Sequence, residues 1–574
     1  MTEANLVEGI GITAEIIRSH LDSAAEEMRR ALIKTAFNPV VYDVHDFGIS
    51  IYNNALDLIS AAPGIPSFLG ANDYAIQKAV SYVGAENLEA GDILMMNYPY
   101  WNSAHTYDAT LFAPIFDPKT TELWAYEVIR CHWLDLGAKN VGSVMDSTEM
   151  HQEGIVLPGT KVYKKGQPNT DVLEILKFNS RMPEAIFGDL NAQVSAIRTG
   201  ERRLHQILQK FGKPMMRSAI DYILAAGEKA SLEALEKLPH GSWKATDYLD
   251  DDGFTDDLIP MNVAVTVSSN EFKVDFTGSA NAVKGPVNLP FGATQSICKI
   301  AFKGLTTPNA SPNAGHYRPL KVEAPEGSLF HAVYPAPTFL LRAGTVALEL
   351  IYKALAEGFK GLISASSGGD NPGFSMIGRR RDNGKLYWIS NNEPVGWGAF
   401  ATHDGGNGVQ HHTVAVGRNT PIEVMELRTG MFIEQMQLTA DSGGAGKYRG
   451  GLGVQRGIRF VEEGMFTCMI KKSKTRPWGI DGGGSPEANR MYIYAGKDDG
   501  KKVGTYRFQA QVGDRCILFT SGGGGYGNPR ERDPELVLSD VLDGYVSPGA
   551  ARSIYAVAVV DGKIEYQETK KLRA

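Results

Sequence analysis

The first strongly patterned stretch of the chain, residues 13–37, repeats apolar residues at three- and four-residue spacing and contains no glycine or proline. This period is that of a helix with one apolar face, and Thr13 stands where a capping residue is expected. Asn38-Pro39 ends the pattern, because a residue that precedes proline avoids the helical region of backbone conformation. The spacing therefore predicts one amphipathic helix over residues 13–37.

Strand-like alternation of apolar and polar positions follows this helix. The predicted strands cover residues 40–53, the stretch after Gly91-Asp92, residues 109–116 and residues 123–133. Histidines and aspartates gather at the ends of these strands and in the turns between them. The first part of the chain is therefore predicted to be a helix plus several strands, with polar chemistry at the strand ends.

The remaining pattern alternates between helices and strands. Residues 188–238 are predicted to form two helices with a break at Gly212-Lys213-Pro214, and residues 345–359 a further helix. Beyond about residue 385, short strands alternate with glycine clusters, followed by a helical patch at 534–544 and a final strand at 554–562. The glycine clusters are interpreted as tight turns between strands.

These elements predict a multidomain α+β protein, with mixed and antiparallel sheets, flanking helices and glycine-rich strand connections in the C-terminal half. A length of 574 residues supports several domains, since one domain takes roughly 100–200 residues. The predicted division is a metal-bearing α+β domain at 1–187, a helical segment at 188–240, an α+β domain at 241–385 and a strand-rich, glycine-rich domain at 386–574.

Charge and cysteine content narrow the class of protein. The net charge is −7 with no run of five or six like charges, which argues against nucleic acid or an anionic membrane as the main partner. Four scattered cysteines form no CxxC pair, so neither a disulfide framework nor a cysteine zinc site is expected. The sequence shows neither a signal peptide nor a membrane-spanning run, and the prediction is a cytoplasmic protein.

The best candidate for chemistry lies between Gly91 and Asp135. His105 and Asp108 lie in the connection between two predicted strands, while His132 ends the next long strand and Asp135 follows it. A hairpin would bring these two ends together. Two imidazoles and one carboxylate suit a divalent ion such as zinc, manganese or iron, with positions left open for water or substrate. Asp46, at the start of an earlier strand, is a candidate fourth ligand.

Other interpretations of these residues remain open. Spacing alone favours the interpretation that His105 and His132 are histidines that bind no ligand, because HxxD is a weak signal. Asp46, with Asp43 and His45, can instead belong to a capped turn. Weaker rival pairs are His403-Asp404 and His411-His412.

Nucleotide chemistry has little support in the chain. It has neither a GxxxxGK[ST] motif nor a strand-linked GxGxxG fingerprint. The glycine run from Ser521 to Gly527 is more typical of a turn than of a phosphate cradle.

Several longer motifs, in order along nearly the whole chain, resemble the hydantoinase B family. They include GDILMMNYPYWNSAHTYDAT, HWLDLGAKNVGS, EMHQEGIVLPGTKVYKKG, NSRMPEAIFGDLNAQVSAIRTGERRL, DFTGSANAVKGPVNLP and GGGGYGNPRERDPELVLSDVLDGYVSP. That family contains B-type subunits of ATP-dependent hydantoinases, lactamases and 5-oxoprolinase, and related subunits of acetone and acetophenone carboxylases. The resemblance implies a metal-bearing subunit of a hetero-oligomer, whose A-type partner carries the ATP-Mg site.

The resemblance also implies roles for particular residues. It places the family's metal ligands on His105, Asp108 and His132, with Asp46 matching an aspartate of its N-terminal segment. The family's usual NDPY is here NYPY, and its usual GGTHLPD is here NSAHTYD, so that Asn102 and Ser103 replace glycines. These departures keep the metal ligands of the family but alter the residues around them, so they bear on the identity of the substrate more than on metal binding.

The function implied is hydrolysis of a cyclic amide through a phosphorylated intermediate made by the A-type partner. Asp135 or Glu153 is the candidate general base or supporting residue. Two alternatives are a subunit of an ATP-dependent ketone carboxylase and a scaffold with a structural metal.

Overall fold

The computed structural model describes residues 3–380, 382–496 and 499–574, and the chain divides into two compact units. The first runs up to Ser242 and adds Asp252–Phe254 and Ala264–Gly344; the second contains Trp243–Asp251, Thr255–Val263 and Thr345–Ala574. The predicted α+β class with mixed and antiparallel sheets is confirmed. The four-domain division stays a prediction, because a compact unit defined by packing can contain more than one domain.

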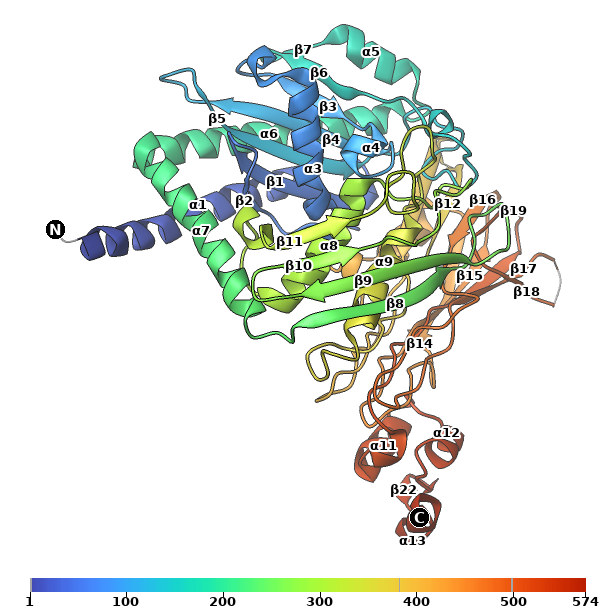
Figure 1. Cartoon of the computed structure of the whole chain (residues 1–574). Helices are drawn as coiled ribbons and strands as arrows, with labels where there is room; N and C mark the ends of the chain where they lie inside the picture. The colour runs from blue at the N-terminus through green and yellow to red at the C-terminus, as the bar shows by residue number, and fades with distance from the viewer. Residues whose placement is uncertain (1–2, 381, 497–498) are drawn as a thin grey trace. The chain divides into compact units, whose positions relative to one another are not determined.

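A seven-stranded antiparallel sheet forms the centre of the first unit (Figure 1), in the order β2-β1-β5-β4-β3-β6-β7. Its strands are β1 (Phe47–Asn53), β2 (Leu58–Ala61), β3 (Ile93–Met96), β4 (Asp108–Phe116), β5 (Leu123–His132), β6 (Pro158–Lys164) and β7 (Gln167–Pro168). The predicted strands at 109–116 and 123–133 are thus confirmed as β4 and β5, and they pair directly with each other.

Helices cover both faces of this sheet. On one face lie α1 (Glu3–Thr35) and α6 (Pro183–Phe211), with α7 (Lys213–Leu235) packed on α1, and on the other lies α3 (Pro66–Val83). Alternate residues of β4 and β5 supply the two cores: Leu111 and Ile129 pack on the α1 and α6 side, Phe112 and Val128 on the α3 side. Any polar residue of β4 or β5 that faces α3 therefore interrupts an apolar surface.

Two predictions for the N-terminal region were wrong. The first helix begins at Glu3, so Thr13 lies inside it and does not cap it. It runs through Gly11, where a Cβ atom would approach the hydroxyl of Tyr222 to 3.0 Å. Residues 40–53 are not one strand, because the Asn38 side chain accepts a hydrogen bond from the Val40 amide and caps a short helix.

That short helix is α2 (Pro39–Tyr42), and β1 begins only at Phe47. The other helices of the first unit are α4 (Pro99–Asn102), α5 (Thr170–Phe178) and α8 (Phe291–Thr306), of which α8 packs on α3. A smaller sheet contains β8 (Gly241–Leu249), β9 (Ile259–Val267), β10 (Phe272–Asp275) and β11 (Leu320–Glu323). Because β10 and β11 pair in parallel and β9 and β10 antiparallel, this sheet is mixed.

The second unit is built on two antiparallel sheets that share one apolar core. The first contains β12 (Gly373–Arg379), β13 (Leu386–Asn392), β16 (Gly464–Met469) and β19 (Tyr506–Ala510). The second contains β14 (Met431–Leu438), β15 (Val454–Phe460), β17 (Arg490–Tyr494), β18 (Lys501–Val503) and β20 (Arg515–Phe519).

Helices complete the second unit: most of α9 (Arg342–Leu355), and α10 (Ile422–Arg428), α11 (Pro534–Leu542), α12 (Pro548–Ser553) and α13 (Tyr566–Arg573). The predicted helix at 345–359 corresponds to α9 and that at 534–544 to α11. The predicted strand at 554–562 was wrong for most of its length, because only β21 (Val559–Val560) pairs there, with β22 (Lys563–Ile564).

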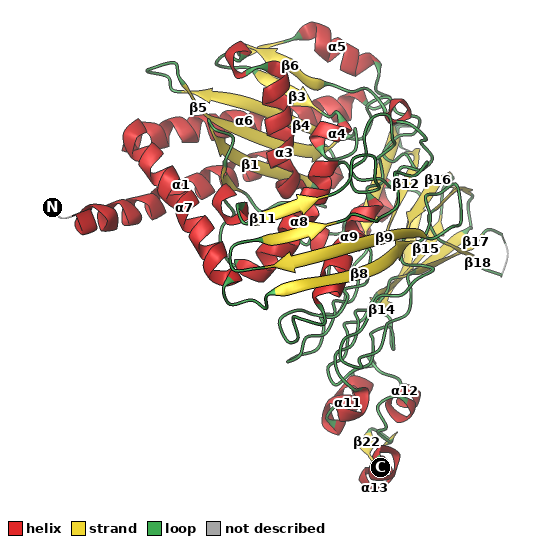
Figure 2. Ribbon diagram, in the orientation of Figure 1, coloured by secondary structure: helices red, strands yellow, loops and turns green. Residues whose placement is uncertain are grey.

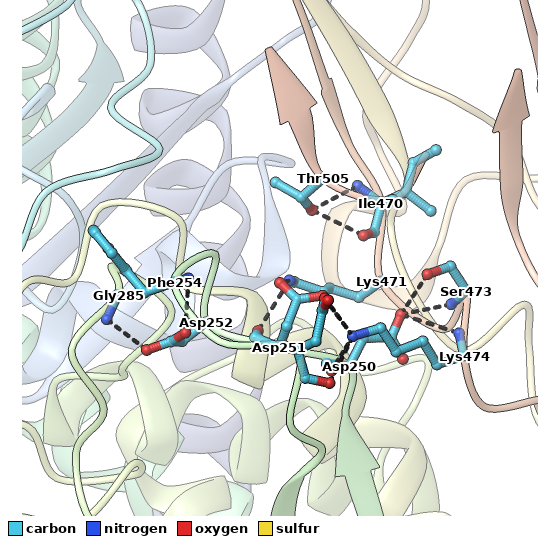
Figure 3. Close-up of polar contacts among 12 residues, drawn as sticks. Asp250, Asp251, Asp252, Phe254, Gly285, Ile470, Lys471, Ser473, Lys474 and Thr505 are labelled. Atoms are coloured by element: carbon cyan, nitrogen blue, oxygen red, sulfur yellow. Dashed lines mark hydrogen bonds and ion pairs between the residues drawn. The ribbon is translucent and has the colours of Figure 1, made fainter. Parts of the chain in front are cut away.

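Ion pairs and hydrogen bonds hold the end of β8 and the two residues that follow it, Asp250 and Asp251, within the second unit. Figure 3 shows Asp250 accepting hydrogen bonds from the Ser473 amide and hydroxyl, while Asp251 pairs with Lys471 at 2.7 Å. Lys471 and Lys472 are almost fully buried, and Lys472 pairs with Asp247. Charges buried at this depth need such partners, because an unpaired buried ion is strongly destabilising.

Glycine-rich connections pack backbone directly against backbone, within the long irregular segments of Figure 2. A Cβ atom at Gly523 would lie 1.9 Å from the Trp397 carbonyl oxygen, and one at Gly524 2.0 Å from that of Trp478. Glycine is therefore required here by close approach, which corrects the interpretation of these clusters as simple tight turns. Among the described residues, no helix is long and apolar enough to cross a membrane.

Candidate metal centre

The hairpin of β4 and β5 brings His105, Asp108 and His132 together, as the spacing predicted. Asp108 and His132 are register partners at the end of the ladder, and Asp108 Oδ1 lies 3.2 Å from His132 Nδ1. His105 lies in the turn before β4, and its Nε2 is 3.3 Å from Asp108 Oδ2. One candidate ligand atom from each residue lies within 4.8 Å of the other two, so the three could hold a metal ion.

Burial suits these side chains to metal binding. Asp108 is fully buried, and the pKa of His105 falls to about 4 because burial disfavours the charged imidazolium more than Asp108 favours it. The pKa of His132 is raised, since the hydrogen bond and charge of Asp108 outweigh its burial. A neutral imidazole such as that of His105 is the form that coordinates a cation.

The donor set passes a test of fit for a divalent ion. Among the described residues, Nδ1 of His105 is buried without a hydrogen-bond partner, and Oδ2 of Asp108 has none besides its 3.3 Å contact with His105. A buried polar atom in that state is costly unless something else satisfies it. Two imidazoles and a carboxylate, without thiolate, are the donors of sites that keep coordination positions open.

Asp46 lies beside this group and not within it. Its carbonyl accepts a hydrogen bond from the His132 amide at 3.3 Å, and burial raises the pKa of its carboxyl to about 7, with His132 opposing and Asp108 adding to the rise. The chain turns here: Asp43 caps α2, and His45 has a left-handed φ of 65°. The turn and a role of Asp46 as a fourth ligand are compatible, and the ligand role stays a prediction.

Asp135 is fully buried and engaged by several donors. Arg181 reaches it with Nη2 at 2.5 Å and Nε at 2.9 Å, and the hydroxyl of Tyr107 donates to it at 2.9 Å. Both carboxylate oxygens of Asp135 are thus occupied by hydrogen-bond donors, Oδ1 by Tyr107 and Arg181 and Oδ2 by Arg181. This geometry favours a supporting role for Asp135 over that of general base, and either role stays a prediction.

Glu153, unlike Asp135, has one carboxylate oxygen that no donor occupies among the described residues. Its Oε1 accepts hydrogen bonds from the Ser147 hydroxyl and the Thr338 and Phe339 amides at 2.8–3.1 Å, while its Oε2 is buried without a partner among the described residues. Burial raises the pKa of Glu153 to about 7 against these hydrogen bonds. A carboxyl near neutrality can both take up and release a proton at physiological pH.

Two neighbours of the centre escaped the sequence analysis. The ring of Phe339 stacks on His105, with centroids 4.6 Å apart, and no local pattern marks a residue so distant in sequence. Arg130, fully buried, lies two positions before His132 on the same face of β5. A charged residue inside an otherwise apolar strand is a signal that could have revealed it.

Two of the departures from the family pattern, Asn102 and Ser103, lie where α4 ends and the turn before β4 begins. Asn102 is buried and donates from Nδ2 to the Asp108 carbonyl at 2.7 Å. Ser103 adopts a left-handed φ of 62°, a conformation that glycine adopts without strain. Both residues therefore shape the turn that carries His105 and Asp108.

The rival sites have other partners. Asp404 pairs with Arg532 at 2.7 Å, which lowers the pKa of Asp404, and His411 lies 3.3 Å from Glu349. In the glycine run, the Gly523 and Gly524 amides donate to the carbonyls of Gly451 and Ser366, so those amides are not available to cradle a phosphate. Within the described part of the chain, the His105 group alone meets the geometric test for three metal ligands.

Known proteins resemble the chain over nearly its full length. A protein of a Pseudomonas species, named as the B-type subunit of a D-/L-hydantoinase, is 30% identical over 98% of both chains. A crystal structure of the ATP-dependent caprolactamase of Pseudomonas jessenii superposes with a TM-score of 0.90 at 26% identity, covering 98% of this chain and 99% of that one. A nucleotide-free structure of acetone carboxylase has a TM-score of 0.89 and covers 98% of this chain and 82% of that one, but at 18% identity it shows a shared fold alone.

The sequence pattern of the family described as Hydantoinase B/oxoprolinase matches residues 11–529, more than half of the chain. Relatives in this group are named as subunits, which implies that such chains work with a partner. The chain belongs to the hydantoinase B/oxoprolinase family.

Proposed function

We propose that this chain is the metal-dependent subunit of an ATP-dependent cyclic-amide hydrolase. It acts on a phosphorylated intermediate made by an A-type partner, on which ATP and Mg²⁺ bind. The observation that carries the proposal is the buried group of His105, Asp108 and His132, whose geometry could hold a divalent ion. Support also comes from relatives named as a hydantoinase subunit and an ATP-dependent caprolactamase.

In the proposed mechanism, His105, Asp108 and His132 hold the ion, with Asp46 as a fourth ligand. A divalent ion in such a site supplies Lewis-acid activation of water and of substrate oxygen. Glu153 would take the proton of the attacking water on its Oε2 atom while the water oxygen bonds to the activated carbon and the C=N π pair moves onto the ring nitrogen. The ring C–N bond then breaks as Glu153 returns the proton to that nitrogen, and hydrolysis of the remaining acyl phosphate releases inorganic phosphate. The Glu153 pKa of about 7 suits this exchange.

The aromatic ring of Phe339 serves the same site in another way. By stacking on His105 it covers one face of the imidazole and fixes its orientation. Asp135 holds Tyr107, which precedes Asp108 by one residue, through the hydroxyl hydrogen bond. These contacts keep the ligand-bearing turn in place during turnover.

The test replaces His105 and His132, singly, with alanine. Each variant, reconstituted with its A-type partner, should lose bound metal by elemental analysis and lose ATP-dependent turnover by at least tenfold. His403→Ala, at an exposed histidine of the second unit, is the matched control and should retain both. Full metal occupancy with unchanged turnover in both His105→Ala and His132→Ala would sink the proposal.

A ketone carboxylase is the second candidate, motivated by the fold shared with acetone carboxylase. Its substrate would be an enolisable ketone, with bicarbonate as the carbon source. The reconstituted complex should be supplied with ATP, labelled bicarbonate and a panel of lactams, hydantoins and ketones. Label in an acid-stable product from a ketone, without lactam hydrolysis, would replace the hydrolase assignment with the carboxylase.

A further inference from the structure

Arg130 occupies an unusual place for a cation. It lies in the middle of the sheet on β5, between Thr110 of β4 and Gly48 of β1, and its side chain is fully buried. The ring of Phe68, from α3, lies over the guanidinium at 5.5 Å. Among the described residues Arg130 makes no direct ion pair, although the charge of Asp108 acts on it, and its Nη1 atom has no hydrogen-bond partner.

The bonds that Arg130 does make converge on one neighbour. Its Nη2 donates to the Asn102 carbonyl at 2.5 Å and to Asn102 Oδ1 at 3.3 Å, and its Nε donates to the Thr110 hydroxyl at 3.1 Å. That hydroxyl in turn donates to Asn102 Oδ1 at 2.6 Å. We call Arg130, Thr110 and Asn102 the Arg130 latch.

The hydrogen bonds of the Arg130 latch extend to Asp108, a candidate metal ligand. With its Oδ1 atom fixed by Thr110 and Arg130, Asn102 directs its Nδ2 at the main-chain carbonyl of Asp108, 2.7 Å away. Asn102 ends α4, and the residues between it and Asp108 include His105. The Arg130 latch therefore ties together the two ends of the turn that carries two of the three candidate ligands, and it does so from the sheet.

Packing alone does not explain such an arrangement. An apolar side chain of similar volume at position 130 would avoid the cost of burying a guanidinium without an ion-pair partner. In metal sites, hydrogen-bond partners behind the ligands fix ligand orientation, and their loss weakens metal binding tenfold to a hundredfold. A buried charge retained next to a candidate metal centre fits that role.

We propose that Arg130 and Asn102 are positioning residues that preorganise Asp108 and His105 for a divalent ion before the ion binds. The inference rests on the metal-binding role proposed above for His105, Asp108 and His132. Preorganisation means that the ligand geometry is already set in the metal-free protein, so that less ordering of the turn opposes binding.

The experiment measures metal affinity directly, without turnover. Full-length protein is stripped with a chelator, and Zn²⁺ or Co²⁺ binding is titrated against a chromogenic competitor. Asn102→Ala should weaken binding tenfold to a hundredfold and alter the Co²⁺ absorption spectrum, and the nearly isosteric Thr110→Val should weaken it less. Arg130→Lys, which keeps the charge but loses the fork geometry, should resemble Asn102→Ala.

Asn489→Ala is the matched control, because Asn489 is a fully buried asparagine of the second unit that accepts from the Ser521 amide and donates to the Lys471 carbonyl. Both alanine variants should lower the melting temperature of the stripped protein, but only Asn102→Ala should weaken metal binding. Affinities within twofold of the native protein in folded Asn102→Ala and Thr110→Val would overturn the inference. A native protein that binds no divalent ion would instead overturn the proposed function itself.

Discussion

Asp108 and His132 stand directly opposite each other in the β4–β5 ladder, and Asp108 Oδ1 lies 3.2 Å from His132 Nδ1. The register of the two strands therefore brings the two side chains together, and their burial shields the contact from water. We expect Asp108→Asn to lower the pKa of His132 in the metal-free protein, because burial then acts with less opposing charge. Histidine NMR titration of the stripped protein measures this pKa. A value unchanged from that of the native protein would contradict the prediction.

Glu153 should make stability depend on pH near neutrality. Its pKa is raised from 4.5 to about 7 in the folded protein, so the proton it binds stabilises the fold below pH 4.5, and this contribution is lost as pH rises through about 7. The stability of Glu153→Gln relative to the native protein should therefore increase as pH rises from about 4.5 to about 7, by roughly 3 kcal/mol at most. Urea unfolding between pH 5 and 8 measures the difference. The exposed Glu149→Gln is the control and should follow the native profile.

Asp135→Asn tests whether Asp135 supports the structure. The substitution removes the charge to which Arg181 and the Tyr107 hydroxyl donate, and hydrogen bonds to a buried charge contribute about 1.5–3 kcal/mol each. We expect a loss of about 2–3 kcal/mol in the free energy of unfolding, measured by urea denaturation. Asp146→Asn, in the exposed pair with Lys139, should cost less than about 1 kcal/mol. Equal effects of the two variants would remove the supporting role.

Close packing of glycine backbones in the second unit should tolerate no side chain. Gly524→Ala would place a Cβ atom 2.0 Å from the Trp478 carbonyl oxygen, and we expect a loss of about 3 kcal/mol or failure to fold. Gly549→Ala, in α12 with its nearest neighbour 3.8 Å away, should be neutral or slightly stabilising. Thermal unfolding of both variants compares them. A stable, native-like Gly524→Ala protein would contradict this account of the glycine runs.

Metal removal should leave the fold largely intact. The candidate ligands are held by the β4–β5 ladder and by hydrogen bonds such as that from the His132 amide to the Asp46 carbonyl, which need no ion. Stripped protein should therefore retain its far-ultraviolet circular dichroism and a cooperative thermal transition. Loss of both on chelation would favour the alternative of a scaffold with a structural metal.

Local pattern was enough for several elements of this protein. The β4–β5 hairpin follows from alternation over short, adjacent stretches, and its register places Asp108 against His132 without any distant contact. The helices α6 and α7, with their break at Gly212, follow from apolar spacing and a glycine that ends the first helix. Segment 40–53 was misread because the cap provided by Asn38 outweighs apolar alternation there.

The chain by itself placed His105, Asp108, His132 and Asp135 at the ends of adjacent strands, and the family resemblance singled out the first three as candidate ligands. Tertiary structure alone decided the character of the residues around them. Burial raises the pKa of Glu153 to about 7 although hydrogen bonds from the Thr338 and Phe339 amides oppose the rise, whereas Asp135 accepts hydrogen bonds from Arg181. Such roles depend on burial and on partners far apart in sequence, and neither quantity is written in a local pattern.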